Sequence, residues 1–364
     1  MEKTRDGRIA WIDVAKGIGI LLIVFGHTMQ SGFVRQVIFS FHVPFFFFLS
    51  GVTYKREASF CTFIRKRIAG LLVPYWVWGI ISIAVFLLMG HFLHLKEADT
   101  GVLNNIFGLL YGNPRTELMW WNRPLWFIPC LFITLLIVDV TERNLLAKNR
   151  GGRKIRIAVI AFSLFLGVIW NKASDFVLPF HLEASLGMIA FTEMGIMFRD
   201  CRIDKQIEKT CVGVKTAVII ICIIAGVFFS SINGWAQVLR CTYGKYPGLY
   251  IVTSVLLITA ATVFAVSVGK NFVFEELGKQ SMCILLMHKF PVLAFQRIIP
   301  VTKGLLSESR PESPITVACG VVVSGICIGL CLLAGNVIGR FLPEIIGQRR
   351  NVQKKLPDFQ KPIG

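Results

Sequence analysis

The chain has 364 residues, of which 54% are hydrophobic and only 16% are charged, whereas a soluble domain carries roughly 25% charged residues. Its formal net charge of +18 would suit nucleic acid, but the basic residues are dispersed over short segments between apolar runs. This pattern excludes a nucleic-acid partner and indicates that anionic lipid head groups lie beside the protein.

Apolar runs recur along the whole chain, at about the 17–25 residues that a helix needs to cross a bilayer. They predict an all-α polytopic membrane bundle of about ten transmembrane helices. We expect one membrane domain over residues 1–340 and a basic cytoplasmic tail over residues 341–364. The predicted spans are residues 9–30, 36–54, 69–95, 124–140, 155–170, 182–198, 215–232, 248–268, 280–300 and 314–339.

The distribution of Lys and Arg predicts the orientation of these helices. With a cytoplasmic N-terminus, 27 of the 39 basic residues fall in cytoplasmic segments, 10 in outer segments and 2 within spans. This asymmetry follows the positive-inside rule, so we expect both termini in the cytoplasm.

The first predicted span, WIDVAKGIGILLIVFGHTM, carries Asp13, Lys16 and His27 in an otherwise apolar helix. Lys16 and His27 are 11 residues apart, which places them on one helix face about 16 Å apart along the axis. Asp13 lies on the same stripe at a spacing that suits an ion pair with Lys16. Mutual neutralisation is the alternative for this pair, but ionisable residues inside a membrane indicate function by default. The glycines of this span should let a neighbour approach closely.

The second span contains FSFHVPFFFFLSG and places His42 at a depth similar to that of His27, because a tight turn joins the two helices. Pro44 would interrupt the helical hydrogen bonds there and open backbone carbonyls to a cavity. No third ligand appears at metal-like spacing, so the two histidines favour acid/base chemistry over a metal site.

A basic stretch, YKREASFCTFIRKRIAGLLVPYW, follows the second span. Positive-inside anchoring would account for it without any special geometry. The alternative is a phosphate clamp, because Arg side chains bind phosphate oxygens through two parallel hydrogen bonds. The candidates for such a clamp are Arg56, Arg65 and Arg67.

Four stretches resemble the acyltransferase-3 family of integral membrane acyltransferases, and specifically its fucose 4-O-acetylase-like branch. They are DVAKGIGILLIVFGH, FHVPFFFFLSG, RPLWFIPCLF and LGKQSMCILLMHKFPV, and the resemblance runs in order from residue 8 to about residue 340. Ser281 and His288 stand at the places of the late Ser and His of the family. Many members have Arg where this chain has Lys16, which keeps the charge but lacks the planar fork.

The resemblance implies an O-acyltransferase of a bacterial plasma or inner membrane that takes an acyl group, usually acetyl from cytoplasmic acetyl-CoA. The acceptor would be a hydroxyl of a cell-surface polysaccharide or a lipid-linked sugar. His27 becomes the catalytic histidine, either as a base or as an acyl carrier, and Lys16 the basic partner on its helix. Asp13, on the same stripe, is a further catalytic candidate. Arg65 and Arg67, with Arg56 nearby, would hold the CoA phosphates. No metal or other cofactor is implied.

Further candidates complete the predicted site. His288 either joins the catalytic group, as the resemblance implies, or packs as a core histidine. Glu193 is expected to pair with Lys16 or a histidine. An oxyanion donor is needed, and His42 or Trp126 could supply it.

Trp126 suits the interface belt or stacks on an acceptor sugar, and Arg123 is a second substrate-binding candidate. His181 is expected to be solvated near the outer interface. A transporter that uses the polar stripe as a proton relay is the alternative function, and a non-catalytic sensor or scaffold is a weaker one. The acceptor, the acyl length and whether the chain forms a homo-oligomer stay open.

Overall fold

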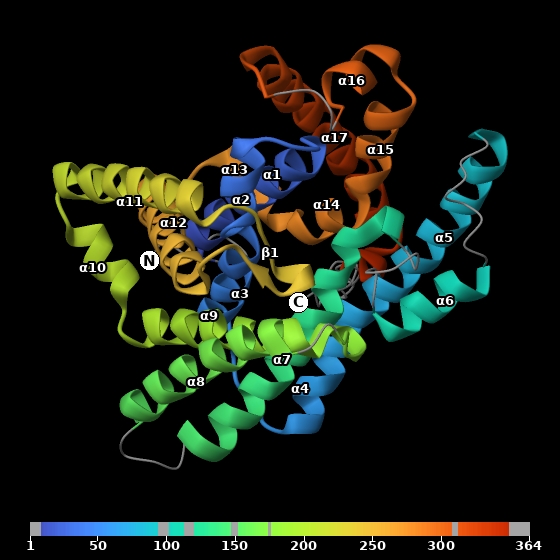
Figure 1. Cartoon of the computed structure of the whole chain (residues 1–364). Coiled ribbons are helices and arrows are strands. Elements are labelled where there is room, and N and C mark those ends of the chain that lie inside the picture. Colours follow the sequence, from blue (N-terminus) through green and yellow to red (C-terminus); the bar gives the residue numbers. More distant parts are fainter. Residues whose placement is uncertain are drawn as a thin grey trace, which may run out of the picture.

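The computed structural model describes residues 9–93, 102–112, 120–146, 152–173, 176–307 and 312–348. These residues are helical apart from short connections and one antiparallel ribbon of strands two residues long (Figure 1). The first helices are α1 (Ala10–Thr28), α2 (Phe33–Phe39), α3 (His42–Val52), α4 (Phe60–Arg67), α5 (Val73–Leu93), α6 (Val102–Tyr111), α7 (Phe127–Thr141), α8 (Gly152–Ala173) and α9 (Leu182–Asp200). The others are α10 (Ile203–Lys209), α11 (Val212–Asn233), α12 (Pro247–Val268), α13 (Phe272–Lys279), α14 (Ser281–Met287), α15 (Lys289–Arg297), α16 (Pro300–Leu305) and α17 (Pro314–Phe341). The ribbon pairs β1 (Ala236–Gln237) with β2 (Thr242–Tyr243).

Among the described residues, 7 helices are long and apolar enough to cross a membrane. This bears out the all-α membrane bundle that the apolar runs predict. The seven are Ala10–Thr28, Phe33–Val52, Phe60–Leu88, Asn122–Asn144, Val212–Asn233, Pro247–Val268 and Pro314–Phe341.

The remaining three predicted spans coincide with helices of a different character. The predicted spans 155–170 and 182–198 lie in α8 and α9, which are not among these seven helices. The predicted span 280–300 is not one helix, because the helix is interrupted at His288, three residues before Pro291. A proline lacks the N–H that would continue the helical ladder. The ten-span count therefore stays a prediction. The basic tail is described only as far as residue 348 and includes a short 3-10 helix, Pro343–Ile346.

Helix α1 lies at the centre of the bundle and divides the apolar core. Its first half, from Trp11 to Ala15, packs into a cluster with residues of α3, α7, α9 and α12. Its second half, from Ile20 to Phe25, packs into a cluster with residues of α5, α14 and α17. The polar residues of α1 are therefore held at fixed depths by apolar contacts on either side.

Glycines bring two pairs of helices into backbone contact. A methyl group at Gly17 of α1 would overlap the carbonyl oxygen of Phe274 in α13, and one at Gly278 of α13 would overlap that of Asp13. The expectation that the glycines of the first span allow close approach is confirmed. Helices α3 and α9 meet in the same reciprocal way through Gly51 and Gly195.

We expect Gly195→Ala to lower the stability of the protein by about 1–3 kcal/mol, the usual cost of overpacking a well-packed contact. The added methyl group would meet the Phe48 carbonyl, which is backbone and cannot rotate away. The thermal unfolding midpoint of purified protein in detergent measures the effect. Gly213→Ala in α11 is the matched control, because no atom lies within 4 Å of the added methyl group. Equal midpoints for the two variants would contradict the prediction.

Candidate active site

Helix α1 presents Lys16 and His27, two of its three predicted site residues, to two different cavities. His27 lines a cavity of about 270 Å³, which we name the His27 cavity. Lys16 lines a second cavity of about 850 Å³, the Lys16 cavity. The two residues are 11 positions apart on one helix, so about 16 Å of helix axis separates them. The structure therefore places Lys16 outside the cavity that contains His27.

The end of α1 that carries His27 is held rigidly. The Gln296 amide nitrogen, Nε2, donates to the backbone oxygens of His27 and Thr28, at 2.9 Å each. The Ser324 hydroxyl donates to Thr28 Oγ1 at 3.0 Å. These bonds satisfy two of the carbonyls that a helix end leaves without partners. The backbone that carries the His27 ring is thus fixed by side chains of α15 and α17.

His42 lies in the same cavity as His27, as their similar predicted depth requires. It begins α3 immediately after a break that separates α3 from α2, and Pro44 stands in the first turn. The His42 Nδ1 is 2.8 Å from the Ile38 oxygen. The Phe39 ring contacts both histidines, with centroid distances of 4.7 Å to His42 and 5.6 Å to His27.

His288 occupies an equivalent position in another broken helix. Its ring centroid lies 5.4 Å from that of His27, and its side chain is buried. Its Nδ1 is 3.0 Å from the backbone oxygens of Ile284 and Leu285. The structure therefore brings all three predicted histidines together, which the sequence suggested for His27 and His42 only by their depth.

The backbone contacts of His42 and His288 assign their tautomer. A carbonyl oxygen only accepts, so the Nδ1 of each ring must carry the hydrogen. The Nε2 of each neutral ring is then a proton acceptor. Neutral His42 is consequently unsuited to the oxyanion-donor role considered for it, and it fits proton acceptance instead.

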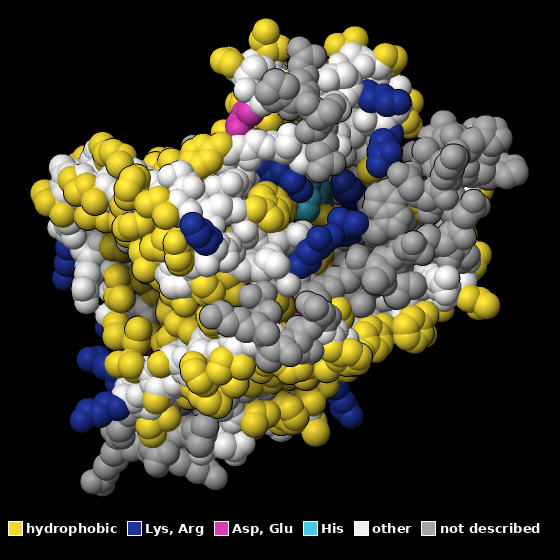
Figure 2. Space-filling view, viewed as in Figure 1, with side chains coloured by type: hydrophobic (Ala, Val, Ile, Leu, Met, Phe, Trp, Pro, Cys, Tyr) yellow, Lys and Arg dark blue, Asp and Glu magenta, His cyan; other side chains and the backbone are white. Residues whose placement is uncertain are grey.

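Basic and aromatic side chains surround the histidines. Both predicted substrate-binding residues, Arg123 and Trp126, line the His27 cavity. Sequence reasoning missed Arg35, Lys289 and Arg297, which line it as well. Figure 2 shows a histidine at the bottom of a hollow that Lys and Arg side chains surround. Arg35 and Arg297 were visible as basic residues near the outer ends of predicted spans and Lys289 as a basic residue within a span, but no local motif joins them.

The Lys16 cavity has a polar lining of its own. Lys279 and Arg340 line it together with Lys16, and Glu276 is a carboxylate in the lining. The Gln280 amide nitrogen bridges Glu276 Oε1 at 2.7 Å and Asn336 Oδ1 at 2.9 Å. Asp13 is buried one turn before Lys16, and the ion pair predicted between them stays a prediction.

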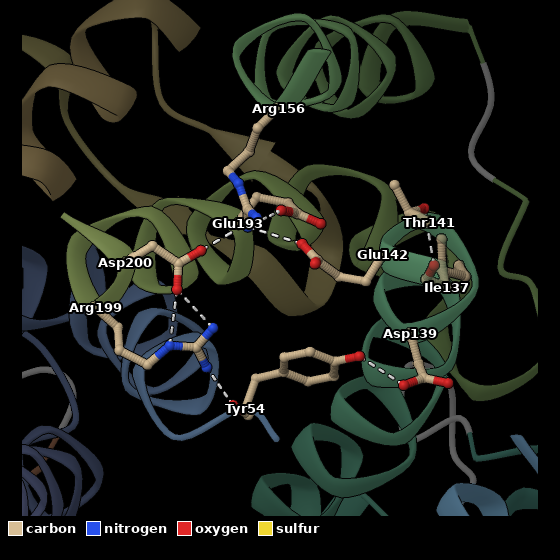
Figure 3. A network of polar contacts seen from close by, with 9 residues as sticks. All are labelled: Tyr54, Ile137, Asp139, Thr141, Glu142, Arg156, Glu193, Arg199 and Asp200. Carbon is tan, nitrogen blue, oxygen red and sulfur yellow. Dashed lines mark hydrogen bonds and ion pairs between the residues drawn. The ribbon is translucent and has the colours of Figure 1, made fainter. Parts of the chain in front are cut away.

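The structure assigns Glu193 a partner that differs from either expected one. Its Oε2 accepts from Arg156 Nη1 at 2.9 Å, and Arg156 also pairs with Glu142 at 2.8 Å and Asp200 at 3.4 Å (Figure 3). The expected pairing with Lys16 or a histidine is wrong, because α8 packs along α9 and carries Arg156 to it. In the same region Tyr54 donates to Asp139 at 2.6 Å. Glu193 belongs to a network that joins α7, α8 and α9.

The three arginines predicted to hold CoA phosphates lie on or before α4. Arg56 and Arg65 are exposed, and the Arg67 guanidinium lies 4.7 Å from the centre of the Phe63 ring. None of the three lines the His27 cavity or the Lys16 cavity. Near Arg56, the Lys66 ammonium bonds the Glu57 carboxylate at 2.5 Å, and this contact lowers the pKa of Glu57.

The expectation of a solvated His181 is wrong. Its side chain is fully buried, and its Nδ1 lies 3.1 Å from Glu183 Oε1. Its φ of 54° is in the left-handed region, where a non-glycine residue is uncommon. The ring packs edge-on to Trp126 at 5.4 Å, so this pair supports the wall of the His27 cavity. The described residues hold no group of three or more His, Cys, Asp or Glu that could hold a metal ion.

The chain matches the model of a known protein family. The model of the acyltransferase-3 family, described as an acyltransferase domain, matches residues 9–334 of the chain. The curated nodulation protein NolL of Sinorhizobium fredii is 29% identical over 114 residues, which is 27% of this chain and 30% of that protein. The chain thus matches less than a third of the length of this relative. No solved structure matches the chain.

Proposed function

Since the chain belongs to the acyltransferase-3 family, we propose that it is a membrane O-acyltransferase that moves acetyl from acetyl-CoA to a sugar hydroxyl. The acceptor would be a cell-surface polysaccharide or a lipid-linked sugar, as in the fucose 4-O-acetylase-like branch. The observation that carries the proposal is the convergence of His27, His42 and His288 beside one cavity. The family match favours acyl transfer over the transporter alternative.

Two polar cavities at opposite ends of α1 suit a reaction between partners on opposite sides of a membrane. The broken helix α14–α15 follows the same course: Gln280 and Ser281 line the Lys16 cavity, whereas Lys289 and Gln296 line the His27 cavity. His288 stands at the break between them. Non-helical backbone inside a membrane is tolerated where it lines a cavity or is buried in protein. An acyl chain entering by the Lys16 cavity would reach His27 along this course.

The orientation follows from the positive-inside distribution. With ten spans and both termini in the cytoplasm of a bacterial plasma or inner membrane, the Lys16 cavity opens to the cytoplasm, where acyl-CoA is found. Lys16, Lys279 and Arg340 would then hold CoA phosphates, with Arg56, Arg65 and Arg67 on the same side. The acceptor would enter the His27 cavity from the outer side.

The chemistry moves one proton from the acceptor hydroxyl to the CoA thiolate. In the direct route, His27 takes the proton of the acceptor hydroxyl, the oxygen attacks the thioester carbon, and the carbon–sulfur bond breaks. The CoA thiolate then takes the proton back from the imidazolium. In the other route, the His27 imidazole attacks the thioester carbon and the CoA thiolate leaves. The acceptor hydroxyl then attacks the acyl carbon, which breaks the bond to the imidazole, and the hydroxyl proton goes to the CoA thiolate. In both routes a negative charge forms on the carbonyl oxygen, which a nearby cation would stabilise. The candidate is Lys289, which lines this cavity and directly follows His288 at the helix break.

The test is acyl-CoA consumption by purified protein in nanodiscs, with and without a cell-envelope glycan fraction. We expect release of free CoA from acetyl-CoA that the glycan stimulates, and less from butyryl-CoA or palmitoyl-CoA. The variant Lys16→Gln should raise the KM for acetyl-CoA more than it lowers kcat, because Lys16 is remote from His27. If no acyl-CoA is consumed with any envelope fraction, the proposed function is wrong.

A further inference from the structure

Four cationic side chains line the His27 cavity. Arg35 comes from α2, Arg123 from the 3-10 helix Trp120–Trp126, and Lys289 and Arg297 from α15. The described residues that line this cavity include no Asp or Glu. The Lys16 cavity differs, because Glu276 accompanies its three basic residues. Among these described lining residues, the charged side chains are therefore all positive.

Arg35 is held in a fixed position at the cavity wall. Its Nε donates to the Gly26 oxygen at 3.2 Å and its Nη1 to the Gln30 oxygen at 2.7 Å. Its guanidinium carbon lies 4.7 Å from the ring centres of both Phe39 and Trp235. An arginine fixed by carbonyls and aromatic rings keeps its full charge and loses little entropy when it binds an anion.

The four charges are close enough to act on one another. Lys289 lies within electrostatic reach of Arg123, Arg35 and Arg297. Like charges gathered in a partly dehydrated space oppose one another, and an anion between them relieves that repulsion. A neutral sugar would leave the repulsion in place. The cavity therefore has a charge pattern that favours a multiply charged anion.

We propose that the acceptor carries a phosphate group, singly or as a diphosphate, which these four cations hold while the hydroxyl to be acylated lies against His27. The inference rests on the proposed acyl transfer and adds the chemical class of the acceptor. One carboxylate needs only one basic partner, whereas phosphate offers more oxygens and more charge to several Arg and Lys side chains. The phosphates of CoA have their own cations in the Lys16 cavity.

The experiment measures binding of radiolabelled inorganic pyrophosphate to the purified chain in phosphatidylcholine nanodiscs, without any acyl-CoA. We expect saturable binding that the double variant Arg123→Gln/Lys289→Gln weakens about 10–100-fold, as the loss of charge-assisted hydrogen bonds predicts. The matched control is Lys279→Gln/Arg340→Gln, which removes two cations from the Lys16 cavity. Arg297→Gln changes one exposed position, so it should fold even if the double variant does not. It should weaken binding less than the double variant does.

Competition then identifies the source of the phosphate. Displacement by geranylgeranyl diphosphate in the nanodisc would support a lipid-linked acceptor, and displacement by glucose 1-phosphate would support a soluble sugar phosphate. The proposal is overturned if no pyrophosphate binds, if only the Lys16-cavity control weakens binding, or if glucuronate displaces it and glucose 1-phosphate does not. Because binding needs no acyl donor, its failure alongside normal CoA release would leave the proposed function intact.

Discussion

Replacement of His27 by alanine is expected to lower the rate of acyl transfer by about 10²–10⁴-fold, the contribution of a positioned general base. The His27 ring lines the cavity that His42 shares, and the His288 ring lies 5.4 Å from it. The measurement is release of free CoA in the presence of a glycan fraction. The fold should survive, because the bonds from Gln296 and Ser324 hold the backbone and Thr28 rather than the ring.

Variants of a second histidine in the cavity should have a smaller effect. His42→Gln should cost less than His27→Ala, because its amide nitrogen can still donate to the Ile38 oxygen that the ring contacts now. If the histidines act as one unit, His27→Ala/His42→Gln should be no slower than His27→Ala alone. His27→Gln, with an unchanged unfolding midpoint, is the control for packing. Activity of His27→Ala within a factor of about two of wild type would remove His27 from the chemistry.

Replacement of Arg156 by alanine is expected to destabilise the protein by about 3–5 kcal/mol, because it leaves buried carboxylates without a counter-charge. Arg156 lies within 2.9 Å of Glu193, whose side chain is fully buried, and within 2.8 Å of Glu142. Its contact with Asp200 is 3.4 Å long and more exposed, so it contributes little. The thermal unfolding midpoint in detergent reports the loss.

Two controls separate charge from packing in this network. Arg153→Ala, at an exposed position on the same helix, should change stability by less than about 0.5 kcal/mol. Adding Glu193→Gln to Arg156→Ala should restore part of the stability, because it removes one buried charge. Below the unfolding temperature, the KM and kcat of Arg156→Ala should match those of wild type, since neither cavity is lined by Arg156. Equal unfolding midpoints for Arg153→Ala and Arg156→Ala would contradict the structural role.

Local sequence determined the membrane bundle and the main elements of the site. A helix that crosses a bilayer must be continuous and apolar, so composition alone predicts helices such as Ala10–Thr28 and Pro247–Val268. The polar residues of such a helix stand out against the apolar background. His27 and His42 were recognisable for that reason, and the tight turn between their helices placed them at one depth. Trp126 and Arg123 follow from the same reading.

Tertiary structure alone decided which polar groups meet. Lys16 and His27 share a helix, yet packing on either side of α1 separates them into two cavities. Glu193 pairs with Arg156, 37 residues away in sequence, and His181 is buried against Glu183 by a left-handed backbone turn. Periodicity along a helix describes which residues share a face of that helix. It carries no information on which neighbour covers the face, because that depends on the packing of segments far apart in the chain.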